Sequence, residues 1–161
     1  MDLQRYVESI LAGRYGAAET APPTLELAEI DSLARRALYY AQRPDFADPR
    51  HIAVALGLRL LPRAPRGLCG EGTALGIIAY RWDADPSVRG LRVAHGVAHA
   101  VLAEERGEHG DADAWLLTAA IVVPPWATEI VLLRPEIATA HAPRWLIDAA
   151  LGVGKDCAAT G

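Results

Sequence analysis

The stretch Leu91-Arg92-Val93-Ala94-His95-Gly96-Val97-Ala98-His99-Ala100-Val101-Leu102 carries two histidines four residues apart inside an apolar run. At 3.6 residues per turn, this spacing places both imidazoles on one face of a helix, one turn apart, where they can share a metal ion. The apolar neighbours predict that the rest of the helix is buried. Two imidazoles at the wall of a core need partners for their ring nitrogens, and a zinc ion would satisfy both at once.

Zinc peptidases of the zincin class use the same spacing in the motif H-E-x-x-H, where the Glu after the first histidine is the general base for the metal-bound water. Gly96 occupies that position here. Removal of a general base typically costs ~10²–10⁴-fold in rate. The stretch therefore predicts metal binding without peptidase activity at the usual level of that class.

A zinc site of this kind needs a third protein ligand, commonly a carboxylate. The acidic residues that follow the histidines are Asp111 and Asp113, at the start of the next predicted helix, and Glu104, Glu105 and Glu108 in the predicted connecting loop. Asp111 and Asp113 are the first candidates and the three glutamates are lesser ones, and Asp111 is equally suited to capping its helix. A helix hairpin turning at residues 107–110 would leave an aspartate short of the metal. His109 and His141 are interpreted as surface residues.

Length and composition favour one domain with a core, since the chain has 161 residues of which 52% are hydrophobic. The net charge of -4 and the single lysine, Lys155, give no support for direct binding to nucleic acid. Cys69 and Cys157 form no C-x-x-C pair, which indicates neither a disulfide framework nor a cysteine zinc site and fits a reducing cytoplasm. No uncharged apolar stretch reaches the ~20 residues of a membrane span, so we expect a soluble cytoplasmic protein.

The order of predicted elements indicates an α+β fold. Hydrophobic periodicity predicts helices over residues 2–11, 25–42, 50–56, 112–122 and from 143 to 151, besides the histidine helix that follows a turn at 83–87. Strands are predicted at 58–61 and 74–80. We expect an N-terminal helix and linker at 1–24, a domain at 25–151 with a short mixed sheet packed on helices, and a flexible tail at 152–161.

Four segments in order resemble the ImmA/IrrE family of zinc metallopeptidase-like domains, over about residues 44–124. DPRHIAVALGL at 48–58 is similar to the short helix that leads into the family's first strand, and GIIAY at 76–80 is similar to the strand that lines its cleft. LRVAHGVAH at 91–99 resembles its active-site helix, usually written R-F-x-x-A-H-E-x-x-H. DADAWLLTAAIVVP at 111–124 resembles its E-x-x-A-x-x-F-A…L-x-P segment, whose first Glu is the third zinc ligand.

The resemblance implies a small zincin-like fold, zinc held by His95, His99 and Asp111, and a protein partner, because family members cleave or engage helix-turn-helix repressors. The chain departs from the family in Gly96, in an Asp where the ligand Glu stands, and in a shorter loop between the two helices. We therefore expect a zinc-binding pseudopeptidase. The alternatives are an active zinc endopeptidase with Glu104 or Glu105 as substitute base, and a metal-free helical interaction module in which the histidines are structural.

Overall fold

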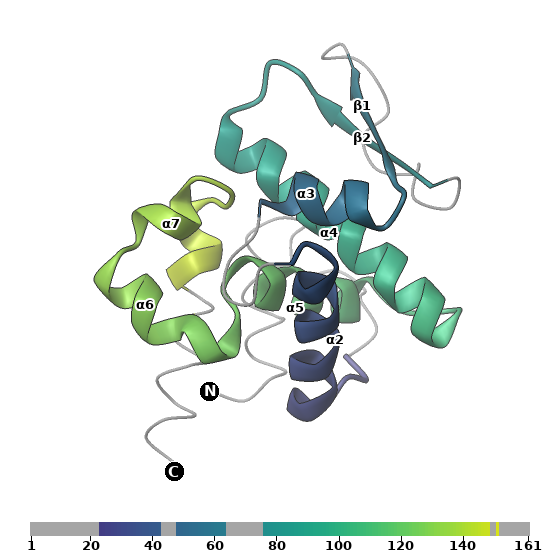
Figure 1. Cartoon of the computed structure of the whole chain (residues 1–161), viewed down its shortest axis with the longest axis horizontal. Helices are drawn as coiled ribbons and strands as arrows, with labels where there is room; N and C mark the ends of the chain where they lie inside the picture. The colour runs from purple at the N-terminus through teal and green to yellow at the C-terminus, as the bar shows by residue number, and fades with distance from the viewer. Residues whose placement is uncertain (1–22, 43–47, 64–75, 149–150, 152–161) are drawn as a thin grey trace.

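The computed structural model describes residues 23–42, 48–63, 76–148 and 151, and it combines helices with a small sheet that lies at one edge of the molecule, an α+β arrangement (Figure 1). The elements are α2 (Leu27–Tyr40), α3 (Pro49–Ala55), β1 (Arg59–Arg63), β2 (Ile77–Arg81), α4 (Pro86–Arg106), α5 (Asp111–Val122), the 3-10 turn η2 (Pro125–Ala127), α6 (Thr128–Leu133) and α7 (Glu136–Thr139). Residues 144–148 are also helical. The predicted helix at 2–11 and the tail at 152–161 lie outside the described residues.

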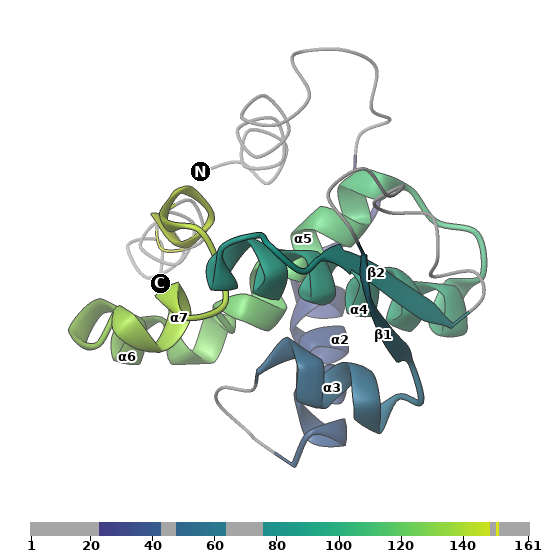
Figure 2. The same ribbon diagram turned by 90° about the horizontal axis from the view of Figure 1, so that it is seen from above.

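Helix α4 is the central element of the fold. It begins at Pro86, whose ring is preset for the first helical turn, and ends before Gly107, which has a φ of 74°. The sheet and α3 pack on one side of α4, and α5 packs on another (Figure 2). Glu104 and Glu105 belong to the last turn of α4. The prediction that they lie in a connecting loop is therefore wrong, because the helix continues to its glycine cap.

The sheet of the described residues consists of β1 and β2 in parallel register, with Arg59 opposite Ile77. The expected mixed sheet is thus corrected to a parallel pair. Parallel strands cannot be joined by a tight hairpin, which agrees with the thirteen residues that separate Arg63 from Ile77 (64 to 76). Strand β2 lies against α4 and supplies Ile78, only 4% exposed, to the core.

Helices α2 and α3 begin and end as their sequences predict. In α2, the Glu26 N–H donates to Glu29 in a capping box, and buried residues recur at helical spacing through Ile30, Leu33 and Leu38. In α3, the Asp48 carboxylate accepts from the Arg50 N–H at the helix start. The predicted helices at 25–42 and 50–56 are confirmed to within two residues at each end.

Helix α5 is buried along almost its whole length, as its uniformly apolar sequence predicts. By length and composition the segment Asp111–Leu133 could cross a membrane, although it contains the charged residues Asp111, Asp113 and Glu129 and is therefore not an uncharged apolar stretch. The segment is nevertheless divided into α5, η2 and α6 around Pro124 and Pro125, and 61% of its most apolar window is buried inside the protein. Its hydropathy is therefore that of a core helix.

Gly90 allows the first part of α4 to lie very close to the backbone of His141. A Cβ at Gly90 would stand 2.4 Å from the backbone oxygen of His141 and 2.7 Å from its Cα. We expect Gly90→Ala to lower the free energy of unfolding by about 3 kcal/mol, because backbone cannot yield as a side chain can. Chemical denaturation measures this loss. The matched control is Gly110→Ala, where a Cβ meets nothing within 4 Å and the expected loss is about 1 kcal/mol or less; equal losses would contradict the close-approach explanation.

Candidate metal centre

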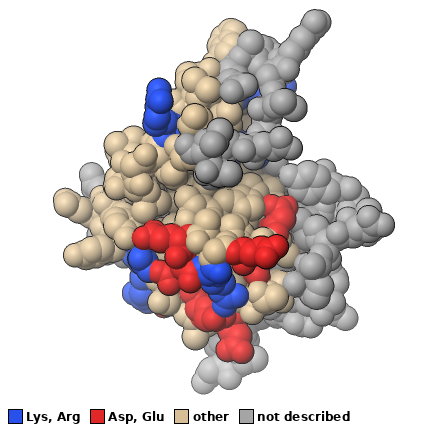
Figure 3. Space-filling model, turned by 90° about the vertical axis from the view of Figure 1, so that its right-hand side faces the viewer, with Lys and Arg blue, Asp and Glu red and all other residues tan. Residues whose placement is uncertain are grey.

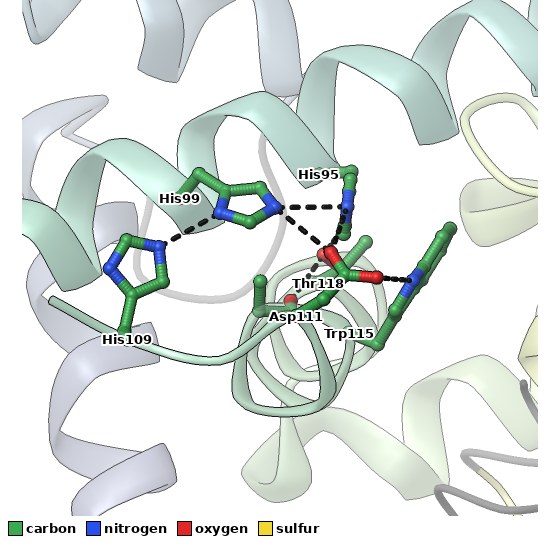
Figure 4. A network of polar contacts seen from close by, with 7 residues as sticks. His95, His99, His109, Asp111, Trp115 and Thr118 are labelled. Carbon is green, nitrogen blue, oxygen red and sulfur yellow. Dashed lines mark hydrogen bonds and ion pairs between the residues drawn. The ribbon is translucent and has the colours of Figure 1, made fainter. Parts of the chain in front are cut away.

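Three side chains from α4 and α5 meet at one point (Figure 4). His95 Nε2 lies 3.2 Å from Asp111 Oδ1, His99 Nε2 lies 3.1 Å from the same oxygen, and the two Nε2 atoms are 3.1 Å apart. His95 is buried, whereas His99 and Asp111 are partly exposed. The predicted ligands His95, His99 and Asp111 are therefore brought together, with one side of the group open to solvent.

Helix α5 crosses α4 instead of running back along it, and this crossing explains how an aspartate reaches the histidines. In Figure 4, α4 runs across the view while α5 is seen nearly along its axis. Asp111, Trp115 and Thr118 share one face of α5 at spacings of four and three residues, and all three contact His95. The expectation that Asp111 falls short assumed an antiparallel hairpin and is wrong for that reason.

The Asp111 carboxylate contacts other side chains and does not cap α5, whose N-cap residue is Gly110. Oδ1 faces the two histidines, and Oδ2 accepts a hydrogen bond from Trp115 Nε1 at 3.2 Å. The capping alternative for Asp111 is therefore not what the structure shows. The indole bond holds the carboxylate with Oδ1 turned toward the imidazoles, which is the role of an outer partner to a metal ligand.

His95 is held in one tautomer by Thr118. The Thr118 hydroxyl donates its hydrogen to the Ala114 carbonyl at 2.6 Å, so its oxygen accepts from His95 Nδ1 at 3.1 Å. Nδ1 therefore carries the hydrogen, and Nε2 of the neutral ring presents a lone pair. The Trp115 ring stacks on the imidazole at a centroid distance of 4.0 Å, which further fixes its plane.

A second chain of hydrogen bonds fixes His99. The Gly107 carbonyl can only accept, so His109 Nδ1, 2.9 Å away, donates to it. In the tautomer whose single hydrogen is on Nδ1, the other nitrogen of His109, Nε2, is an acceptor, and it lies 2.8 Å from His99 Nδ1. His99 Nδ1 must supply that hydrogen, which leaves His99 Nε2 with a lone pair pointing at Asp111 and His95.

The donor set fits a tetrahedral zinc ion. Two nitrogens and a carboxylate oxygen, all acceptors, converge with edges of 3.1–3.2 Å and no hydrogen available between them in these tautomers. Ligands about 2.0–2.1 Å from a tetrahedral centre are about 3.4 Å apart, so the three atoms are close to one face of such a tetrahedron. A cation would satisfy all three lone pairs, and a fourth position would face solvent.

The charge states of the group also suit a metal. Burial, the largest cause, lowers the pKa of His95, so its imidazole is neutral at pH 7. The contacts with His95 and then His99 hold the pKa of the Asp111 carboxyl group well below its usual range, so the carboxylate is ionised. Zinc requires a neutral imidazole and a deprotonated carboxylate, and both are present at neutral pH.

The space beside Gly96, the position predicted to lack a general base, is filled by Ile78 of β2. A Cβ built on Gly96 would lie 2.8 Å from both Cγ1 and Cδ1 of Ile78 and 3.0 Å from its Cγ2. Gly96 thus permits β2 to pack directly on α4, one residue beyond His95. There is no space at this position for the side chain of a glutamate.

The remaining acidic candidates lie elsewhere. Glu104 and Glu105 both pair with Arg36 of α2. The Asp113 carboxylate accepts from the Thr24 N–H at 2.7 Å, the Thr24 hydroxyl at 2.6 Å and the Leu25 N–H at 3.0 Å, so it anchors the chain before α2 instead of joining the histidines. Glu108 and His141 are not in the group, and His141 lies 4.0 Å from Asp48.

Sequence reasoning missed the supporting residues. His109 was interpreted as a surface histidine, yet it contacts His99 directly. The sequence did contain a sign of these contacts. His109 is two residues before Asp111, and Trp115 and Thr118 follow Asp111 by four and seven residues, on the same face of a helix. Residues that hydrogen-bond to metal-binding histidines are often found close to another ligand in sequence, as these are. The sequence does not show, however, which way residues 107–110 turn and so which side chains reach the histidines.

His95, His99 and Asp111 form a group that could hold a metal ion, and they lie in an α+β fold. Comparison of the chain with protein families, with curated proteins and with solved structures gave no match.

We expect His109→Ala to weaken zinc binding by ~10–100-fold, the usual effect of removing an outer partner of a metal ligand. Competition with a chromophoric chelator measures this affinity. His51→Ala is the matched control, because His51 is exposed on α3 and makes no contact with the group. Equal affinities for the two variants would show that His109 does not orient His99.

Proposed function

We propose that this chain is a zinc-binding, ImmA/IrrE-like domain of the zincin type that has lost peptidase chemistry and acts by binding another protein. The observation that carries the proposal is the convergence of three ligand atoms, from His95, His99 and Asp111, each ligand side chain being in contact with a further side chain. In the tautomers that Thr118 and His109 favour, these atoms are acceptors 3.1–3.2 Å apart, and a cation between them would relieve their repulsion.

When bound, zinc in such a site supplies a Lewis acid that lowers the pKa of a coordinated water. The chain's own residues hold the ion and fix the orientation of its ligands. Thr118 and His109 keep the Nδ1 hydrogens of the two imidazoles occupied, and Trp115 holds the Asp111 carboxylate. These interactions support tight binding of a metal ion. Tight binding is needed whether the ion stabilises the fold or helps the chain to bind a partner.

The absence of a base at position 96 supports the pseudopeptidase assignment over an active endopeptidase. Ile78 fills the space beside Gly96, and the two proposed substitutes, Glu104 and Glu105, pair with Arg36 in the last turn of α4. A general base must reach the water's proton directly or through one water molecule. Neither carboxylate belongs to the group that holds His95, His99 and Asp111.

A protein partner suits the surface better than a nucleic acid does. At the C-terminal end of α4, acidic side chains gather around a few basic ones on the face shown in Figure 3. The chain as a whole has 20 acidic against 16 basic residues. A face whose described arginines are paired with acidic side chains offers no free positive charge to phosphate backbones. A helix-turn-helix repressor, which carries its own basic surface, is the class of partner we propose.

Incubation of the zinc-loaded chain with a purified helix-turn-helix repressor tests this function. We expect complex formation, measured by isothermal titration calorimetry, with the repressor intact by mass spectrometry. Cleavage of the repressor that stops on zinc removal would favour the endopeptidase alternative. A chain that holds no zinc and binds the repressor unchanged would favour the metal-free interaction module.

A further inference from the structure

The Asp113 carboxylate fastens the residues before α2 to the first turn of α5. Asp113 is only 3% exposed, and a buried carboxylate is costly unless donors surround it. Its Oδ1 accepts from the Thr24 N–H at 2.7 Å and the Leu25 N–H at 3.0 Å, and its Oδ2 accepts from the Thr24 hydroxyl at 2.6 Å. Three hydrogen bonds to one carboxylate therefore join parts of the chain that are 88–89 residues apart.

The same residues are also fastened to the end of α4. Arg106, in the last turn of α4, donates to the Thr24 hydroxyl oxygen at 3.2 Å and to the Glu29 carboxylate at 2.6 Å. We call residues 24–29, which comprise the start of α2 and the three residues before it, the strap. The strap thus bridges the two helices that carry the metal group, α4 through Arg106 and α5 through Asp113.

The first turn of α5 depends on contacts of this kind for its order. The first N–H groups of a helix lack acceptors within the helix, and the N-cap residue of α5 is Gly110, which has no side-chain oxygen to accept from them. Asp111 and Asp113 lie two residues apart in this turn, so their side chains project roughly 200° apart around the helix axis. The turn is therefore held between the histidines on one side and the strap on the other.

We propose that the strap regulates the metal group, with Asp113 as a positioning residue. By holding Asp113, the strap keeps the Asp111 carboxylate where it can share an ion with His95 and His99, and the bound ion in turn holds the strap in place. This inference rests on the proposed zinc site and adds a means of its regulation. Coupling between two sites is reciprocal, so the strap tightens zinc binding by the same factor by which zinc disfavours release of the strap.

Substitution of Asp113 tests the first half of this coupling. We expect Asp113→Ala to bind zinc about tenfold more weakly, a usual size for coupling between sites, as measured by competition with a chromophoric chelator. Asp113→Asn should retain most of the affinity, because an amide oxygen can still accept from both N–H groups. Leu146→Ala is the control, since Leu146 is fully buried in the helix at 144–148 and its loss lowers stability through a cavity without touching the strap.

Hydrogen exchange of the unsubstituted chain tests the second half, and it decides the matter even if Asp113→Ala does not fold. We expect the Thr24 and Leu25 amides to exchange about tenfold more slowly with zinc than with a chelator, by the same reciprocity. The amides of Ala41 and Gln42, which donate to carbonyls in the last turn of α2, should exchange at equal rates in both, because fraying there leaves the metal group intact.

Three results would overturn the strap as a regulator while the zinc site stands. They are equal zinc affinities of Asp113→Ala and the unsubstituted chain, a loss of affinity as large in Leu146→Ala as in Asp113→Ala, and exchange at Thr24 and Leu25 that zinc does not slow. An unsubstituted chain that holds no zinc would overturn both the strap and the proposed site.

Discussion

Purified without a histidine tag, the chain is expected to contain about one zinc ion, and its His95→Ala variant almost none. His95 is the most buried ligand, and its Nε2 is one of three acceptors that meet at 3.1–3.2 Å. Loss of one of three protein ligands leaves a site that cannot complete a tetrahedron with protein atoms. Elemental analysis of the two proteins after dialysis measures the difference directly.

Zinc should also stabilise the folded chain, because an ion that binds only the native state adds about 4 kcal/mol when its concentration is a thousandfold above Kd. For a chain of this length, such a gain corresponds to a rise in Tm of about 10 °C. A chelator should abolish this rise in Tm for the wild-type chain and for His51→Ala, but should leave the Tm of His95→Ala unchanged. Substoichiometric zinc that is unaffected by His95→Ala would leave the metal-free module as the better explanation.

The sequence predicted α4 and its two histidines because helical periodicity is a local property of the chain. Asp111 was also identified as the third ligand, but through its resemblance to a family motif. Its reach depends on the crossing of α4 and α5, which follows from how Gly107 turns the chain and how the apolar faces of both helices pack. Such crossings are set by side-chain packing between helices and are not encoded at any single position.

The contacts that the sequence could not predict join residues from different elements. Ile78 meets Gly96 across eighteen residues, and Thr24 donates to Asp113 across 89. Asp113 is a reasonable metal candidate by residue type, and only the position of the chain before α2 shows that both its oxygens are already used. Residue type therefore indicated which groups can bind a metal, while tertiary packing decided which of them are free to do so.

Substitution of Gly96 by Glu is expected to destabilise the fold strongly and to produce no peptidase by itself. The new Cβ would lie 2.8 Å from Ile78 Cγ1 and Cδ1, and the added carboxylate would enter space that the isoleucine fills. Overpacking and an unpaired buried charge together should cost about 2–4 kcal/mol of unfolding free energy. A negative activity result for the single variant would therefore say little about the metal.

The double variant Gly96→Glu with Ile78→Ala is the informative one. Alanine lacks all three Ile78 atoms that the Cβ would strike, so the double variant should be about 1–3 kcal/mol more stable than the sum of the two single losses predicts. With a carboxylate base placed next to His95, zinc-dependent cleavage of an unfolded protein substrate should rise by ~10²–10⁴-fold over the parent.

Gly96→Gln with Ile78→Ala is the control for that gain, because glutamine has the shape of glutamate but cannot accept a proton from water at neutral pH. Cleavage by the glutamate variant alone would show that the parent is a pseudopeptidase whose only missing group is the base. Cleavage by the parent at the same rate would contradict the proposed function. Equal cleavage by the glutamine and glutamate variants would contradict the assignment of position 96 as the site of that base.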